Sequence, residues 1–138
     1  MDRAEKAAAF FTDGCNCAQA VFTAFADELG LDEELAKRLA CGLGGGVGRM
    51  REVCGAVSAA AMVIGMRQGP DKAQVYPSDQ DFCAAFKSTC GSIICRDLLQ
   101  DVEATTGGAP EVRTPDYYAR RPCLKLVKFA ASLLEKRS

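Results

Sequence analysis

Apolar residues recur every three or four positions along most of the chain, the spacing that places side chains on one face of an α-helix. A clear example follows Asn16, where the apolar positions are Ala20, Val21, Ala24, Phe25 and Leu29. We find no convincing strand, internal repeat or second domain. The sequence therefore predicts an all-α protein, a single-domain compact bundle of about six helices that spans residues 1–138.

Capping residues and glycines mark where the helices should begin and end. Asn16 is followed three residues later by Gln19, as in a capping box, and Gly30 fits the end of that helix. Asp32 fits the N-cap of the next helix. The predicted helices cover residues 2–12, 16–29, 32–43, 51–67, 78–90 and 122–135, with a short helical segment at 92–101.

The same pattern predicts which faces are buried. Leu35, Leu39 and Leu43 should face the core from their helix, while its charged residues face solvent. Residues 56–64 are almost free of charge, so the helix that contains them should be the most buried one. The loops that follow Gly69 and Thr105 should be the mobile parts.

The composition narrows the chemistry. The 138 residues include 17 Lys and Arg against 18 Asp and Glu, so neither a nucleic acid nor an anionic membrane surface is expected as a partner. Histidine is absent, which excludes Ser-His-Asp and Cys-His catalysis as well as zinc or haem bound by imidazole. Eight cysteines remain as the main candidates for chemistry.

The expected location is the cytoplasm. The N-terminal residues lack the basic stretch and long apolar run of a signal peptide. The longest apolar segment, residues 53–66, is too short to cross a bilayer, so no membrane insertion is expected. In a cytosolic chain that is long enough to form a core, cysteines indicate metal binding or thiol chemistry rather than a disulfide framework.

Four of the cysteines lie close to the starts of predicted helices. They are Cys17, Cys54, Cys95 and Cys123. The unpaired N–H groups at a helix N-terminus carry partial positive charge, which favours a thiolate over a thiol. In a bundle, four helix N-termini can converge on one site. We therefore expect these sulfurs to be anionic and to form a discontinuous site, with one cysteine from each helix.

The other four cysteines are weaker candidates. Cys83 and Cys90 are seven residues apart and share a helix face, a spacing typical of core positions. Cys41 ends a helix that carries leucines. Cys15 is too close to Cys17 for an unstrained local disulfide, but it could serve as a resolving thiol.

A glycine-rich run at residues 42–48 suggests a phosphate loop but does not fit one. It lacks the lysine and hydroxyl of that motif, and no strand precedes it. Its glycines allow two helices to turn sharply and approach closely. A further hypothesis is that their N–H groups hydrogen-bond to the sulfurs of the site.

Several segments together resemble one known family. They are, in order, NCAQAV at residues 16–21, GGGVGR at 44–49, CGA at 54–56, GSIICR at 91–96 and the late Cys123. The chain resembles the redox-active proteins of the C_GCAxxG_C_C family along nearly its whole length. The resemblance implies a site of four cysteines, carried by Cys17, Cys54, Cys95 and Cys123. One departure is Ala59, where the last glycine of the motif would stand, and we expect tighter packing there.

Three functions are open at this point. The first is a metal site, either an iron–sulfur cluster for electron transfer or a zinc ion, with Cys17, Cys54, Cys95 and Cys123 as ligands. The second is thiol–disulfide exchange, with Cys17 and Cys54 as the redox thiols or Cys95 paired with Cys123. The third is a helical interaction protein whose cysteines only fill the core.

Metal binding is favoured among these functions, because four convergent thiolates repel one another unless a cation neutralises them. The partner would be an electron carrier or a thiol protein. A homodimer is compatible with the sequence.

Overall fold

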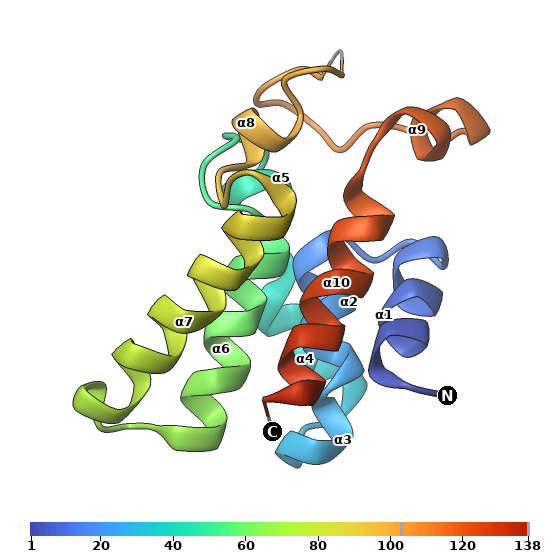
Figure 1. Cartoon of the computed structure of the whole chain (residues 1–138). Helices are drawn as coiled ribbons and strands as arrows, with labels where there is room; N and C mark the ends of the chain where they lie inside the picture. Colours follow the sequence, from blue (N-terminus) through green and yellow to red (C-terminus); the bar gives the residue numbers. More distant parts are fainter. Residues whose placement is uncertain (103, 138) are drawn as a thin grey trace.

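The computed structural model describes residues 1–102 and 104–137, and it confirms the predicted all-α fold (Figure 1). The longer helices are α1 (Arg3–Thr12), α2 (Cys17–Ala24), α4 (Glu33–Ala40), α6 (Gly55–Gln68), α7 (Lys72–Cys90) and α10 (Cys123–Lys136). The shorter elements are α3 (Ala26–Leu29), the 3-10 helix η1 (Cys41–Leu43), α5 (Gly44–Val47), α8 (Cys95–Leu98) and α9 (Pro115–Arg120).

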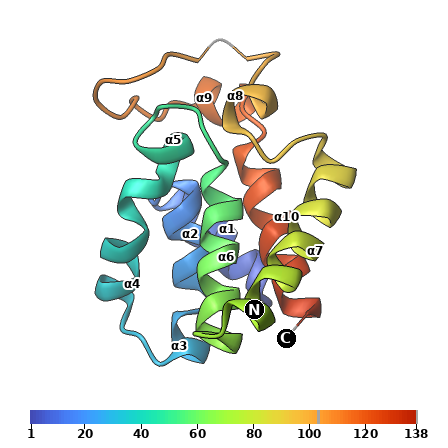
Figure 2. The ribbon, with the colours of Figure 1, turned by 90° about the vertical axis from the view of Figure 1, so that its left-hand side faces the viewer.

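The hydrophobic core lies between α1, α2, α6, α7 and α10. Figure 2 shows α6 between α4 and α7, with α1 and α2 behind it. Alanines on α2 and α6 let these two helices pack closely, and four fully buried phenylalanines fill the wider spaces. They are Phe22, Phe25, Phe82 and Phe86. The prediction that residues 56–64 form the most buried helix fits this arrangement, since Ala56, Ala59 and Ala60 are fully buried.

The predicted cap of α2 is confirmed. The Asn16 side chain accepts a hydrogen bond from the Gln19 N–H, and the Gln19 side chain accepts one from the Asn16 N–H. Asp32 caps α4 in the expected way, and Gly30 ends α3 in the left-handed conformation. These local signals therefore determine where α2 and α4 begin and where α3 ends.

The predicted buried face of residues 32–43 is wrong at Leu35 and Leu39, whereas Leu43, in η1, packs against the core. The side chains of Leu35 and Leu39 are 42% and 50% exposed, whereas Ala36 and Ala40 are fully buried. Helix α4 packs against α2 through its small residues, because alanine lets the two backbones approach more closely than leucine would. The leucines then flank the contact instead of filling it.

Two predicted helix starts are also wrong. Helix α7 begins at Lys72, where the Asp71 side chain accepts a hydrogen bond from the Ala73 N–H, and Pro77 lies inside it. Pro77 lacks only one N–H, and this loss does not stop the helix. Helix α6 begins at Gly55 rather than residue 51, because Val53 forms an isolated antiparallel bridge with Ile94.

The short elements gather at one end of the molecule. In both views α5, α8, α9 and the loop between α8 and α9 lie at the same end of the bundle (Figures 1 and 2). Helices α2, α6 and α10 begin there, so the N–H groups of their first turns point toward this end. Within the described part of the chain, no helix combines the length and the hydropathy needed to span a membrane.

Candidate functional site

A cavity of about 660 Å³ lies at the end of the bundle where these helices begin. Five cysteines line it: Cys17, Cys41, Cys54, Cys95 and Cys123. The structure therefore brings the four predicted site cysteines to one cavity. It also adds Cys41, an exposed residue that the sequence pattern placed only at a helix end.

The four predicted cysteines all stand at helix starts, as the sequence indicated. Cys17, Cys95 and Cys123 are the first residues of α2, α8 and α10, and Cys54 is the N-cap of α6. Each sulfur is thus attached next to a group of N–H donors that the helix itself leaves unpaired. Helix starts that are far apart in the sequence meet because α2, α6 and α10 run in the same direction.

Two of these cysteines are fixed by a short pairing between loop segments. The Cys54 N–H donates to the Ile93 carbonyl at 2.8 Å, and the Cys95 N–H donates to the Glu52 carbonyl at 2.6 Å. The bridge between Val53 and Ile94 lies between these two bonds. It holds the starts of α6 and α8 side by side, which no local signal in the sequence predicts.

Cys17 and Cys54 form a hydrogen-bonded pair of sulfurs. The Cys54 S–H donates to Cys17 and lowers the pKa of Cys17 to about 6, although burial opposes this shift. The N–H groups of Gly45, Ala18 and Ala56 also donate to the Cys17 sulfur. The same bond, together with burial, raises the pKa of Cys54 well above its usual value. The surroundings therefore favour the anionic form at Cys17 and the protonated form at Cys54.

Glycines make this pairing sterically feasible. A Cβ atom on Gly55 would lie 2.7 Å from the Cys17 Sγ and 2.9 Å from the Leu43 carbonyl oxygen, so no larger residue fits there without movement. Gly45 has a φ of 66°, a left-handed conformation that glycine adopts without strain. Its N–H is one of the donors to Cys17, as the hypothesis for the glycine run proposed.

The surroundings favour the anionic form at Cys17 but oppose it at Cys54, Cys95 and Cys123. Burial raises the pKa of Cys95, although the Arg51 guanidinium, 3.8 Å from its Sγ, opposes this shift. Burial and the nearby Cys17 charge raise the pKa of Cys123 to about 12. One anion at Cys17 thus makes a second anion more costly, and the buried thiols keep their protons.

A metal site needs several donor side chains grouped around one ion. Over residues 1–102 and 104–137, no three cysteine, aspartate or glutamate side chains are grouped so that they could hold one metal ion. The predicted ligands Cys17, Cys54, Cys95 and Cys123 line one cavity, but among the described residues they do not form such a group. A four-sulfur site would require the thiols to move together and lose their remaining protons.

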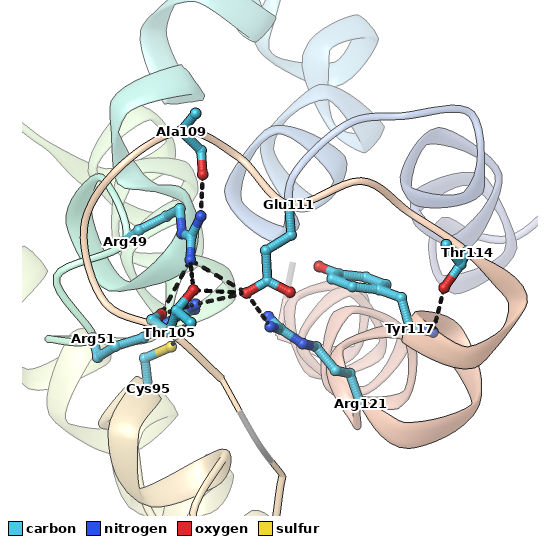
Figure 3. A network of polar contacts seen from close by, with 9 residues as sticks. All are labelled: Arg49, Arg51, Cys95, Thr105, Ala109, Glu111, Thr114, Tyr117 and Arg121. Atoms are coloured by element: carbon cyan, nitrogen blue, oxygen red, sulfur yellow. Dashed lines mark hydrogen bonds and ion pairs between the residues drawn. The ribbon is translucent and has the colours of Figure 1, made fainter.

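An arginine cluster that lines the cavity was not predicted from the sequence. Arg49, Arg51 and Arg121 all reach the carboxylate of Glu111, which lies on the loop between α8 and α9 (Figure 3). Arg49 and Arg51 also donate to the Thr105 carbonyl on this loop. We call residues 105–113 the strap, because these contacts hold it beside the cavity.

A family comparison matches residues 15–137 to the family described as "Putative redox-active protein (C_GCAxxG_C_C)". The chain belongs to the C_GCAxxG_C_C family. No curated protein and no solved structure matches the chain. Residues 54–56, the CGA segment that resembles the motif of the family, form the start of α6, where Gly55 leaves room for the Cys17 sulfur. The motif thus contains both a cysteine of the sulfur pair and the glycine that the pair needs.

The cysteines outside the motif have different surroundings. Cys83 and Cys90 lie on α7 and pack against the core, and burial raises the pKa of both. This is the packing role that their seven-residue spacing suggested. Cys15 also packs against the core, and burial raises its pKa. The surroundings of Cys17 differ from these, because they lower its pKa.

Proposed function

We propose that the chain is a thiol–disulfide redox protein in which Cys17 is the attacking thiolate and Cys54 the resolving thiol. The observation that carries this proposal is the hydrogen bond from Cys54, which lowers the pKa of Cys17 to about 6. A cysteine with this pKa is mostly thiolate at neutral pH, and the thiolate is the nucleophile in disulfide exchange. Cys17 also lines the cavity, so a small disulfide can reach it.

The proposed reaction transfers two electrons from the protein to a disulfide substrate. The Cys17 thiolate attacks one substrate sulfur, forms a mixed disulfide and releases the first substrate thiolate. The Cys54 thiol then gives its proton to that thiolate and attacks the Cys17 Sγ. The Cys17–Cys54 disulfide forms, and the second substrate half leaves as a thiolate. A dithiol donor reverses these steps and restores the reduced protein.

The environment of the pair suits this sequence of steps. The N–H groups of Gly45, Ala18 and Ala56 stabilise the resting anion on Cys17, and Gly55 leaves room for its sulfur beside the start of α6. Cys95 and Cys123 line the same cavity as neutral thiols. We expect these two thiols to react more slowly than Cys17.

The test uses the reduced protein and 2-hydroxyethyl disulfide, a neutral oxidant. Acid quenching followed by peptide mass mapping should show a Cys17–Cys54 disulfide and the loss of two thiols. Cys54→Ala should stop the reaction at a mixed disulfide on Cys17. Cys90→Ala removes a partly buried thiol of α7 and serves as the matched control, which should react as the wild type does.

A second readout follows the charge on Cys17 directly. Alkylation by iodoacetamide, measured as a function of pH, should give a pKa of about 6 for Cys17 in the wild type. In Cys54→Ala this pKa should rise, because the S–H donor is lost. Alkylation of Cys17 at its usual pKa, with no Cys17–Cys54 disulfide, would overturn the proposal and leave the cysteines as packing residues.

Metal binding is a second candidate function. The observation that favours it is the position of four cysteines at four helix starts around one cavity, in a chain without histidine. Thiolates at these positions would suit an iron–sulfur cluster or zinc. The ligands would be Cys17, Cys54, Cys95 and Cys123.

Anaerobic reconstitution with iron and sulfide, or with zinc, tests this candidate by elemental analysis. Stoichiometric metal that is lost in Cys123→Ser but kept in Cys83→Ser would support it. The two variants differ in that Cys123 lines the cavity, whereas Cys83 packs against the core from α7. Protein that stays free of metal after reconstitution would contradict it.

A further inference from the structure

Three guanidinium groups that line the cavity converge on a single carboxylate oxygen. The Nη2 atoms of Arg121, Arg49 and Arg51 lie 2.6, 3.2 and 3.7 Å from the Glu111 Oε1 (Figure 3). Two of these side chains, those of Arg51 and Arg121, are only 8% and 6% exposed. Three cations in so small a volume repel one another, and one carboxylate neutralises only part of their charge.

The arginines also have hydrogen-bonding capacity that the described residues do not use. A guanidinium has five N–H donors, and Glu111 is the only hydrogen-bond acceptor of Arg121 among the described residues, although its guanidinium also stacks on the Tyr117 ring. The Arg49 Nε is buried and has no partner among the described residues. Buried donors without acceptors are costly, so this cluster can take a further anionic acceptor.

The charged side chains that line the whole cavity have a net positive charge. Four arginines line the cavity, against the two carboxylates of Asp13 and Glu111. The fourth arginine is Arg113, which donates to the carbonyls of Phe11 and Cys15 and stacks on the Phe11 ring. Even with a thiolate at Cys17, the cavity is positive, which attracts anions and repels cations.

The carboxylate at the cluster belongs to a segment that has no buried residue. Glu111 lies on the strap, whose neighbouring residue Val112 is 83% exposed. Hydrogen bonds rather than buried apolar side chains hold the strap. Arginines donate to its backbone at Thr105 and Ala109, the Gly107 N–H donates to the Arg49 carbonyl, and Arg113 anchors its end to the carbonyls of Phe11 and Cys15. Glu111 therefore occupies an anion site without being locked there by packing.

We infer that Arg49, Arg51 and Arg121 form a binding site for the carboxylate of a small anionic disulfide or thiol, and that this carboxylate takes the place of Glu111. Arg51 joins this site to the sulfurs, because its Nη1 lies 3.8 Å from the Cys95 Sγ. A ligand bound at the cluster places its sulfur in the cavity that Cys17 lines. The carboxylate site stands on the arginine geometry, and the disulfide part of the ligand rests on the proposed function.

The first experiment measures carboxylate binding without any redox chemistry. The probe is suberate, which has the shape of 3,3′-dithiodipropionate with carbon in place of sulfur. Calorimetric titration of the whole reduced chain should show saturable binding that weakens as salt is added. Glu111→Gln should tighten binding about threefold or more, because it removes the internal competitor.

The second experiment measures exchange rates with three disulfides that differ in charge. They are 3,3′-dithiodipropionate, 2-hydroxyethyl disulfide and cystamine, which carry two negative charges, no charge and two positive charges. Wild-type protein should react with the dianion about tenfold faster than with the dication, once the rates are normalised to a free thiol. Arg121→Gln should remove most of this preference.

Arg120→Gln is the matched control, because Arg120 is adjacent in sequence but pairs with Asp116 and is half exposed. It should keep both suberate binding and the charge preference. If Arg121→Gln fails to fold, Glu111→Gln still tests the site, because tighter binding cannot come from unfolding.

The outcomes separate the two proposals. Suberate binding that depends on Arg121, without any exchange at Cys17, keeps the carboxylate site and overturns the redox function. Exchange at Cys17 without a charge preference or suberate binding keeps the redox function and overturns the site. Binding that is equal in the wild type, Glu111→Gln and Arg121→Gln also overturns the site.

Discussion

The helical bundle and the cavity end of the molecule are held together by different interactions. In the bundle, fully buried side chains such as Phe22 and Phe86 pack between close helices, and hydrophobic burial supplies most of the stability. At the cavity end, arginines bind backbone carbonyls and a single carboxylate. The bundle thus carries the folding energy, while the cavity end carries unpaired donors, a thiolate and an opening to solvent.

Strained backbone conformations also occur at the cavity end of the molecule rather than in the bundle. Val47, Arg49 and Arg51 have positive φ values of 64°, 66° and 60°, and they are the non-glycine residues with this conformation in the described chain. Such conformations cost about 1–3 kcal/mol each and persist only where the surroundings fix them. Arg49 and Arg51 line the cavity, and Val47 directly precedes Gly48, which also lines it. The comparison teaches that a stable bundle can support a strained and charged site at the start of its helices.

The largest expected effect is a loss of stability caused by a substitution in the bundle, with no change in the site. Phe86→Ala removes a fully buried ring that lies 6.1 Å from the Phe82 ring and 5.9 Å from the Phe129 ring, centroid to centroid. The free energy of unfolding should fall by about 3–5 kcal/mol. Urea denaturation measures this loss. The pKa of Cys17 in the folded fraction should not change, and a clear change would contradict the separation of the two regions.

The next effect arises where the two regions meet. Gly55→Ala introduces a Cβ that would lie 2.7 Å from the Cys17 Sγ, so it should lower the free energy of unfolding by about 1–3 kcal/mol. It should also raise the pKa of Cys17. Gly65→Ala in the same helix meets nothing within 4 Å and should stabilise by about 0.5–1 kcal/mol. Equal effects of the two variants would refute the steric role of Gly55.

A smaller effect comes from the pH dependence of stability. Cys17 has a folded pKa of about 6, below its unfolded value of about 8.5, so the unfolded chain binds one more proton between these values. The stability that Cys17 contributes should therefore rise by up to about 1.4 kcal/mol per pH unit from pH 6 to about 8.5. Cys17→Ala should remove this part of the slope. Parallel denaturation curves for the two proteins would argue against a folded-state thiolate.

The trend should reverse at higher pH. The raised pKa values of Cys54 and Cys123 mean that the folded chain keeps protons that the unfolded chain has lost above about pH 9. Stability should then fall as pH rises. The free energy of unfolding, measured at several pH values on both sides of pH 9, should therefore pass through a maximum near that pH.

The smallest expected effect lies on the outer surface of the bundle. Leu39→Gln changes a side chain that is 50% exposed, so the free energy of unfolding should change by no more than about 0.5 kcal/mol. A loss above about 1 kcal/mol, measured by urea denaturation, would mean that Leu39 packs as the sequence pattern predicted.

Local chemistry in the sequence predicted much of the fold. Asn16 and Gln19 define the start of α2 because their side chains bond to nearby backbone groups. The positions of Cys17 and Cys123 at helix starts follow from similar short-range signals. By contrast, the start of α6 depends on the pairing of Val53 with Ile94, which joins residues that are far apart in the sequence.

The sequence by itself determined that the protein is helical, that its chemistry is cysteine chemistry, and which four cysteines lie at helix starts. Only the tertiary structure decided their charge. A helix N-terminus favours a thiolate, but burial opposes it, and the balance depends on the neighbours that folding brings. Cys17 receives an S–H and three N–H donors, whereas Cys123 receives burial and the repulsion of Cys17. For this reason the folded surroundings favour a thiolate at Cys17 and a thiol at Cys123.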